Sequence, residues 1–457
     1  MQDKTIATAA PKRTMGLASA SAMLIGTVVG ASVFIVPGQL AASAGPAVWL
    51  SYLIGAVVIL FAAFTFANIG AIMPVSAAVY RLSVSTVNGT WGFLYIWVFA
   101  ISSIFLMPIM SLTVAQYLGV FHPALNSLFV ALAVVVISGV INAIGMKVSS
   151  GFQNILVIFF TVIILSFIIG GISNANWDNF QPMFPEGVMP VVTGVVATYY
   201  AFAGFNNIIE LSGEIKKPGR NIARVVFLSL GVIVTLYIGV ALAAVALLAP
   251  AKLGVDAPIS VAAMTLFPKW FSNLIALSAV AASWTTLNAV MAVLSRQIFA
   301  LSRSRILPMA WSKINRSGTP YNAVIVVTLL GVLMTAFSDD VMKFVNLSST
   351  YILATALVAA VSSLLIKKRL PERYANAQYK LKGVWFYFFP IMVLVTSTFF
   401  LVLAVLEDPW MSLYSGILLP VGVLLYWSRS NIVKKSGMSV EEAVAEAIDA
   451  ETQTISA

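Results

Sequence analysis

Apolar runs long enough to cross a lipid bilayer recur from one end of this chain to the other. Of its 457 residues, 60% are hydrophobic and only 9% are charged. Soluble globular chains carry about 25% charged residues, whereas a membrane-spanning helix needs about 20 mostly apolar residues. Because lipid offers the backbone no hydrogen-bond partners, such segments fold as helices. We therefore predict an all-α polytopic membrane protein.

The apolar runs divide into twelve predicted spans. They cover residues 16–40, 44–70, 93–120, 124–144, 152–173, 189–213, 224–249, 272–300, 322–337, 344–366, 383–405 and 410–428. When the loops are assigned to alternate sides, one side holds only Lys252, Lys269 and Lys343 of the 26 lysines and arginines. The positive-inside rule then places both termini in the cytoplasm. We expect a multi-pass protein of the cell inner (plasma) membrane.

The first span contains residues that are unfavourable inside a helix. Residues 24–38 read LIGTVVGASVFIVPG, with three glycines and one proline. Relative to alanine, glycine costs roughly 1 kcal/mol and proline roughly 3 kcal/mol inside a helix. A break at membrane depth is tolerated only where protein or a water-filled cavity receives the freed backbone groups. The stretch predicts a broken helix at a binding site, although glycine also allows close packing of membrane helices.

A second interrupted stretch lies in the sixth span. Its centre, residues 199–207, reads YYAFAGFNN, with Gly204 among aromatic side chains. Spans 1 and 6 each open a block of five, and interrupted segments at corresponding positions of two halves point to an inverted-repeat transporter with its site at mid-membrane. We predict repeats over 16–173 and 189–366, two further spans within 383–428, and cytoplasmic tails at 1–15 and 429–457.

The two breaks together suit a zwitterion. The half-helix that begins after the first break offers free N–H groups and a partial positive charge to a carboxylate. Carbonyl groups freed in span 6 accept hydrogen bonds from an ammonium group. No Asp, Glu, Lys or Arg occupies the central part of any span, where a charge costs at least ~2.5–3.5 kcal/mol. We therefore predict a small or medium neutral L-amino acid as the substrate.

Four longer motifs occur in a fixed order along the first ten spans. They are GTVVGASVF followed by Pro37, GPAVWLSYLIG at 45–55, FAGF with SGEIKKPGRNI at 212–222, and SRQIFALSRSRILP at 295–308. Together these motifs resemble the amino acid–polyamine–organocation (APC) permeases. The resemblance implies a five-plus-five inverted repeat (LeuT-like) with broken helices 1 and 6, two additional C-terminal helices, and secondary active transport by alternating access.

The resemblance also implies roles for residues at both breaks. The substrate carboxylate is expected at Gly30, Ala31 and Ser32, and the amine at Phe202 and Ala203. Tyr200 is expected to act as a gate. Four more side chains complete the predicted substrate pocket: Ser102, Ser103, Phe205 and Asn206.

Some of these residues also suit simpler structural roles. Ser32 fits a hydrogen bond to a carbonyl one turn earlier in its helix, and Phe202 and Phe205 fit ordinary packing. Outside the site, Glu214 with Lys216 or Lys217 is typical of a structural ion pair at the cytoplasmic end of span 6. The tail from residue 438 onward predicts a soluble acidic helix or a disordered end.

The sequence leaves the coupling ion open among sodium, protons and pure exchange. Some relatives carry a coupling lysine in the middle of span 5, where this chain has Phe159, Phe160 and Thr161. We therefore do not expect proton coupling through a lysine, and we expect no buried carboxylate to replace it.

Span 8 provides the basis for a sodium hypothesis. Thr285 and Thr286 lie on one helical face with Ala282, at i, i+3 and i+4. Their hydroxyls, joined by the carbonyls of Gly26 and Val29, would give sodium an all-oxygen shell. This arrangement resembles the sodium site of distant transporters that share the fold.

Three rival functions are compatible with some of the same features. A membrane enzyme would need convergent titratable groups or metal ligands, which the spans do not offer, and the chain has no cysteine. A nutrient sensor with a transporter fold would bind its substrate without flux. A polyamine or cationic amino-acid permease or antiporter is the runner-up, although Asn206 without a nearby carboxylate counts against it. We expect no cofactor, no nucleic acid partner, an amino acid and membrane lipid as partners, and a monomer or homodimer.

Overall fold

The computed structural model describes residues 12–30, 32–119, 121–122, 124–202, 204–255, 257–337, 341–407, 409–435 and 437–456. Within these residues the chain is helical, apart from loops and an isolated bridge between Met15 and Ile215. Eight helical runs are long and apolar enough to cross a membrane, and the first of them, Leu17–Ile72, contains two predicted spans. Three shorter apolar helices account for three more spans: Met189–Tyr199, Tyr321–Ala336 and Thr350–Leu364. The prediction of an all-α polytopic membrane protein is confirmed.

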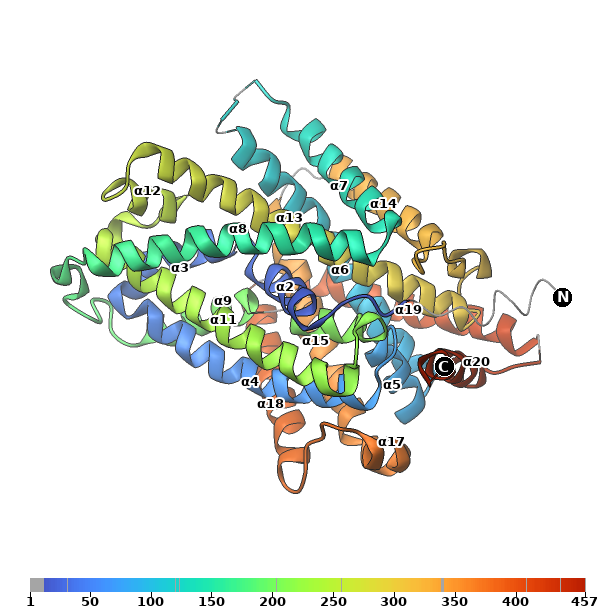
Figure 1. Ribbon diagram of the computed structural model, residues 1–457. Helices are drawn as coiled ribbons and strands as arrows, with labels where there is room; N and C mark the ends of the chain where they lie inside the picture. Colours follow the sequence, from blue (N-terminus) through green and yellow to red (C-terminus); the bar gives the residue numbers. More distant parts are fainter. Residues whose placement is uncertain are drawn as a thin grey trace.

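Figure 1 shows the helices in chain order, which we group here by the predicted repeats into a first block, a second block and a C-terminal group. The first block contains α2 (Leu17–Val29), α3 (Ser32–Ala44), α4 (Val48–Ile72), α5 (Ala78–Thr86), α6 (Gly89–Gly119), α7 (Ser127–Ile144) and α8 (Met146–Ser173). The second contains α9 (Met189–Ala201), α10 (Phe205–Glu210), α11 (Pro218–Leu247), α12 (Pro258–Met264), α13 (Lys269–Arg303), α14 (Tyr321–Ala336) and α15 (Val341–Leu364). The last group contains α16 (Ile366–Arg369), α17 (Pro371–Asn376), α18 (Trp385–Glu407), α19 (Pro409–Lys435) and α20 (Val440–Ser456).

Both predicted helix breaks are present. The gap between α2 and α3 contains Gly30 with a φ of 42°, and the gap between α9 and α10 contains Gly204 with a φ of 118°. Residues with a Cβ rarely adopt such positive φ values, so glycine allows the chain to leave the helix at these two points. Pro37, by contrast, lies inside α3 and does not end it.

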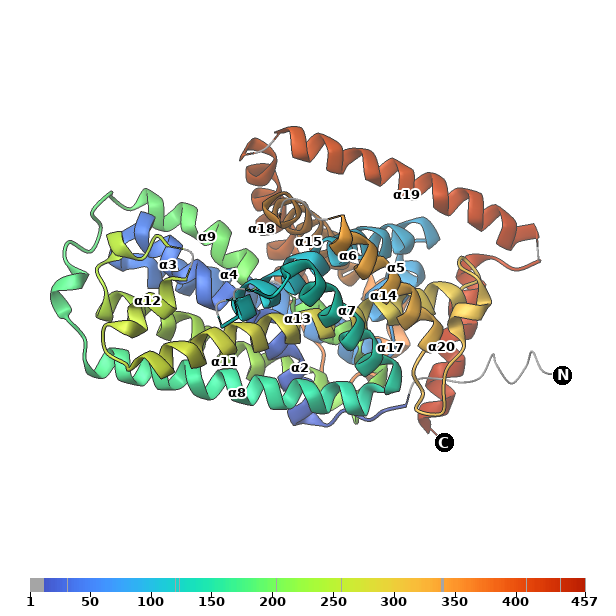
Figure 2. The ribbon, with the colours of Figure 1, turned by 90° about the horizontal axis from the view of Figure 1, so that it is seen from above.

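The broken helices lie in the middle of the bundle. α2 packs against α8, α11 and α13, and α9 packs against α3 and α4. A Cβ on Gly204 would lie 3.3 Å from Val28, so the second break is close to the first. Figure 2 shows α19 along the outer edge of the molecule, on the side of α6 and far from α8 and α11.

Gly26 allows α2 to approach its neighbours closely. A Cβ at this position would collide with the Gln153 amide of α8 and would lie 2.8 Å from Val157 and 3.0 Å from Thr285 of α13. The glycines of span 1 therefore serve close helix packing at Gly26 and a change of backbone direction at Gly30. The break and the close packing are thus both present, at different residues, and a binding site at the break stays a prediction.

Glu214 forms a buried ion pair with Arg296 of α13. Its Oε1 lies 2.5 Å from Nε and its Oε2 lies 3.3 Å from Nη2, and both side chains are buried. The expected pairing with Lys216 or Lys217 is wrong, because both lysines are exposed. The true partner is 82 residues away in sequence and reaches Glu214 only through the packing of α10 on α13.

Removal of this carboxylate is expected to destabilise the protein strongly. Glu214→Ala leaves the Arg296 guanidinium buried without its counter-charge, and loss of one partner of a buried pair costs about 3–5 kcal/mol. Thermal unfolding in detergent measures the effect. Glu372→Ala, at an exposed position of α17, is the matched control and is expected to change the melting temperature little. Equal shifts for the two variants would contradict a stabilising role for the pair.

Candidate functional site

One tyrosine hydroxyl connects the ends of both broken helices. Tyr237 of α11 is fully buried, and its hydroxyl oxygen lies 3.0 Å from the carbonyl oxygen of Ala201, 3.2 Å from that of Val29 and 3.4 Å from that of Val28. These residues end α9 and α2, where the last carbonyls of a helix lack partners within the helix. The hydroxyl has one hydrogen, so it donates to one of these oxygens at a time.

Ser32 belongs to the same hydrogen-bonded group. Its Oγ lies 2.6 Å from the Tyr237 hydroxyl and donates to the carbonyl oxygen of Val29 at 3.0 Å. The simpler role, a bond to a carbonyl one turn earlier, is therefore present. Ser32 is also the first residue of α3 and is only partly buried, so its place at the break agrees with the predicted contact to a carboxylate, which stays a prediction.

The ring of Tyr237 packs against two other aromatic rings. Tyr52 of α4 stacks on Tyr237 with ring centroids 5.3 Å apart, and Phe202 meets Tyr237 edge to face at 5.1 Å. Phe202 and Tyr52 also meet edge to face, at 6.1 Å. All three side chains are fully buried. Phe202 thus has the simpler packing role, against the rings of Tyr52 and Tyr237.

The groups predicted to hold sodium are only partly assembled. The Gly26 carbonyl oxygen accepts hydrogen bonds from Thr285 at 3.0 Å and from Thr286 at 2.9 Å. The carbonyl of Val29 instead receives Ser32 and Tyr237. Three of the four predicted groups therefore meet, whereas the fourth is engaged in the group around Tyr237.

Gly30 separates these two groups. A Cβ on Gly30 would lie 2.9 Å from the Thr286 Oγ1, and the positive φ already disfavours any side chain here. The backbone at the break is therefore held between α13 and the group around Tyr237, with room for glycine only.

Ser102 and Ser103 of span 3 were predicted to line the substrate pocket, and the structure shows hydrogen bonds of Ser102 to another helix. Ser102 exchanges hydrogen bonds with Ser348 of α15, each hydroxyl donating to the other residue's carbonyl oxygen at 3.1 Å. Ser103 is buried beside it on α6. The structure thus directs Ser102 toward α15, and a role for either serine in the pocket stays a prediction.

Two further predicted residues lie on α10. Phe205 and Asn206 are buried at the start of this helix, immediately after the second break. Ala31 and Ala203 lie outside the described residues, as does the side chain of Tyr200.

A buried carboxylate corrects one sequence expectation. Glu210, the last residue of α10, is fully buried, and its Oε1 accepts a hydrogen bond of 2.7 Å from the Tyr95 hydroxyl. Its peptide carbonyl accepts a hydrogen bond of 3.0 Å from the Ala77 N–H. The expectation of no buried carboxylate is therefore wrong. The signal that sequence reasoning passed over was the position of Glu210, only six residues after the Gly204 break and on the same short helix.

The tail helix α20 packs against the end of the bundle that we predict to be cytoplasmic. Its buried side chains follow a helical stripe: Val440, Ala443, Val444, Ala447, Ile448 and Glu451. This spacing of i, i+3, i+4 and i+7 is typical of a helix with one buried face. Of the two alternatives for the tail, the acidic helix is therefore present and the disordered end is wrong, and one face of this helix packs on the bundle.

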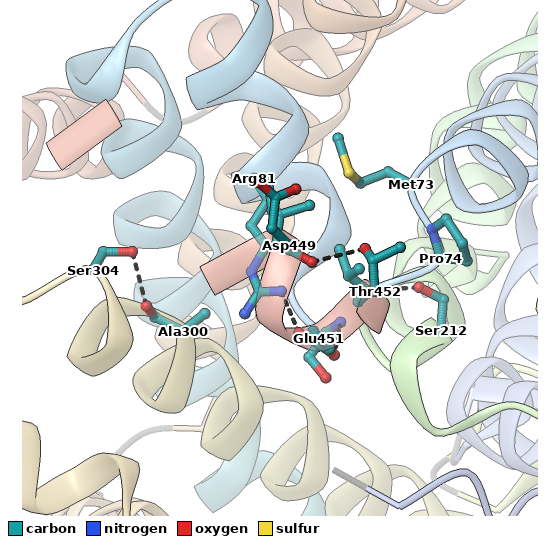
Figure 3. Close-up of polar contacts among 12 residues, drawn as sticks. Met73, Pro74, Arg81, Ser212, Ala300, Ser304, Asp449, Glu451 and Thr452 are labelled. Atoms are coloured by element: carbon teal, nitrogen blue, oxygen red, sulfur yellow. Dashed lines mark hydrogen bonds and ion pairs between the residues drawn. The ribbon is translucent and has the colours of Figure 1, made fainter. Parts of the chain in front are cut away.

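Glu451 fixes α20 to the loop after α4. It forms a buried ion pair with Arg81 of α5, and its Oε1 accepts a hydrogen bond of 2.9 Å from the Ser76 N–H. Figure 3 shows Arg81 and Glu451 meeting beside Ser212. A second carboxylate, Glu441, accepts a hydrogen bond of 2.8 Å from the Gly89 N–H at the start of α6. These two carboxylates fix α20 to segments of the first block, and the helix also packs on α13 of the second block.

Comparison with known proteins decides the family. A family model described as amino acid permease matches residues 15–428. The chain belongs to the amino acid permease family. This places it in the APC superfamily, as the motifs of spans 1 to 10 predicted, in a family of transporters rather than enzymes.

The similar proteins differ in what their names say they carry. The chain is 26% identical to the methylthioribose transporter of Bacillus subtilis, over 80% of this chain and 83% of that protein. It is also 26% identical to the branched-chain amino acid permease BcaP of the same organism, over 92% and 93%. Cationic amino acid transporter 9 of Arabidopsis thaliana is 27% identical, over 66% and 57%. The three names indicate transport but not a single class of substrate.

Substitution of Gly30 tests whether the break is the site of binding. Gly30→Val places a branched side chain at a positive φ, against Thr286, and strain of this kind costs about 1–3 kcal/mol before the contact is counted. We expect uptake of the permease substrate to fall at least about tenfold. Gly231→Val on α11 is the matched control, because a Cβ there meets no atom within 4 Å. Wild-type uptake by folded Gly30→Val in proteoliposomes would move the site elsewhere.

Proposed function

We propose that this permease is a secondary active transporter of small or medium neutral L-amino acids that works by alternating access, as a symporter or an exchanger. The observation that carries the proposal is the Tyr237 hydroxyl, which lies between carbonyls freed at both helix breaks. An ammonium group has three donors and can satisfy several such oxygens at once, so this is where the amine of a substrate would bind.

The carboxylate of a zwitterionic substrate would bind at the start of α3. Ser32 opens this helix, and free N–H groups at a helix N-terminus attract a carboxylate. The predicted contacts of Gly30, Ala31 and Ser32 with the carboxylate and of Phe202 and Ala203 with the amine are part of this proposal. So are Tyr200 as the gate and the five-plus-five inverted repeat, in which α2–α8 would correspond to α9–α15.

The surroundings of the breaks support a neutral side chain on the substrate. The covering rings belong to Tyr52, Phe202 and Tyr237, and the side chains of Phe205 and Asn206 follow on α10. The buried carboxylate of α10, Glu210, lies one turn beyond Asn206 and accepts the Tyr95 hydroxyl, so these groups around the breaks include no carboxylate to compensate a cation. The name of the branched-chain permease agrees with this choice, whereas the name of the cationic transporter keeps a cationic substrate as the alternative.

A ligand screen on purified protein tests the substrate class. Alanine, serine, leucine and methionine are expected to raise the melting temperature, because a ligand at 100 times its Kd stabilises the folded state by about 2.7 kcal/mol. Arginine, lysine and putrescine are expected to have no effect, and the D-enantiomer of the best ligand serves as the control. Stabilisation by the three cations alone would replace the proposal with the cationic or polyamine permease. Binding without flux in proteoliposomes would indicate a sensor.

We also propose sodium as the coupling ion, on the ground that both threonine hydroxyls meet the Gly26 carbonyl. An inward sodium gradient is then expected to drive accumulation in proteoliposomes, and Thr286→Ala is expected to abolish this sodium dependence. Thr235→Ala is the matched control, since this exposed threonine of α11 bonds only within its own helix.

The alternatives to sodium predict different results in the same vesicles. Accumulation driven by a proton gradient and lost in Glu210→Gln would favour the buried carboxylate as the coupling group. Uptake that requires only internal substrate would favour pure exchange. In both cases the hydrogen bonds of Thr285 and Thr286 would be structural.

A further inference from the structure

A basic groove lies at the start of α11, away from the helix breaks. It has a volume of 520 Å³ and is bounded by the first turns of α11 and by Gln378 and Tyr379, which precede α18. Leu228, the residue of the groove furthest along α11, lies nine positions before Tyr237, which corresponds to about 13 Å of helix. The groove is therefore separate from the proposed substrate site.

The polar end of the groove carries positive charge. Arg220 and Arg224 occupy positions i and i+4, so their guanidinium groups project from the same face of α11. Both side chains are exposed, and among the described residues neither has an acidic partner within ion-pair distance. Arginine is suited to bind phosphate through paired N–H donors.

Tyr379 adds an unused hydrogen-bond donor to the groove. Its hydroxyl is buried from solvent and, within the described part of the chain, has no hydrogen-bond partner. Burial raises the pKa of Tyr379 to about 12, so the hydroxyl keeps its proton at neutral pH. The ring is held by Phe227, whose centroid is 6.2 Å away. Because buried polar groups normally have partners, this hydroxyl indicates a ligand with an acceptor oxygen.

The other end of the groove is apolar and faces outward. Phe227 packs on Phe64 of α4 with ring centroids 4.7 Å apart, and Leu228 has 55% of its surface exposed. Both α11 and α18 are long and apolar enough to span a membrane, so the groove lies where two spanning helices reach one face of the bilayer. A soluble anion would use only the polar end, whereas a lipid uses both.

We propose that this groove binds the headgroup of an anionic phospholipid. The phosphate would contact Arg220 and Arg224 and accept a hydrogen bond from Tyr379, and an acyl chain would lie over Phe227 and Leu228. Charge supports this assignment, because the inner leaflet is rich in anionic lipid and basic pockets between spanning helices recognise its headgroups. By joining α11 to the segment before α18, a bound lipid would tie the second block to the C-terminal pair of spans.

Native mass spectrometry of the detergent-solubilised protein tests the proposal. The protein is titrated with phosphatidylglycerol or with phosphatidylcholine of the same acyl chains. We expect saturable binding of one phosphatidylglycerol at concentrations where phosphatidylcholine is not retained. Arg220→Gln with Arg224→Gln is expected to weaken this binding about thirtyfold, since each basic residue contributes about a factor of five. Tyr379→Phe is expected to weaken it less, about threefold to tenfold.

Matched controls distinguish this lipid site from a soluble-phosphate site and from general attraction to positive charge. Arg305→Gln with Arg316→Gln removes two other exposed arginines and is expected to leave the binding of phosphatidylglycerol unchanged. Equal retention of the two lipids, or equal losses from the two double variants, would overturn the proposal. Competition by free glycerol phosphate at the same concentration as the lipid would show a site for soluble phosphate and would also overturn it. The readout is lipid binding and does not depend on the transported substrate.

Discussion

Every backbone group at membrane depth needs a hydrogen-bond partner inside the protein, and the organisation of this permease depends on how that requirement is met at two helix breaks. The helices α2 and α9 end in the middle of the bundle and leave carbonyls without partners in their own helices. Tyr237 supplies one hydroxyl between them, and Ser32 adds a second donor at Val29. The breaks are therefore stabilised by a side chain from a third helix, α11. The ends of α2 and α9 and the middle of α11 meet at the Tyr237 hydroxyl.

The ends of the bundle are held by charge instead. Glu214 pairs with Arg296, and Arg81 pairs with Glu451, with all four side chains buried. The N-terminal segment adds a backbone bridge, because Met15 exchanges hydrogen bonds with residues 214 and 216. Because a charge is costly to bury without its partner, each of these contacts depends on both of its residues.

The sequence predicted those features that depend on local chemistry. Gly30 and Gly204 indicate breaks because glycine is unfavourable inside a helix, and this effect can be read from the residue and its immediate neighbours. Each of the twelve apolar runs likewise indicates a span from its own composition. The partners of Glu214 and Glu451 could not be predicted, because Arg296 and Arg81 approach only when distant helices pack. Tyr237 was missed for a related reason. A tyrosine in a span signals that its hydroxyl has a partner, but not that the partner is the end of another helix.

The bonds of Tyr237 have a consequence for how firmly a substrate can be held. The carbonyls of Ala201 and Val29 already receive hydrogen bonds from hydroxyls of the protein, from Tyr237 and Ser32 respectively. At the proposed site an arriving amine would displace these hydroxyls, so binding would exchange one set of hydrogen bonds for another, and the net gain per exchanged bond is only about 0.5–1.5 kcal/mol. A departing amine would likewise leave no unpaired carbonyl behind. If the substrate amine binds there as proposed, the exchange would favour rapid turnover over tight retention, because hydroxyls of the protein would replace the amine whenever the substrate leaves.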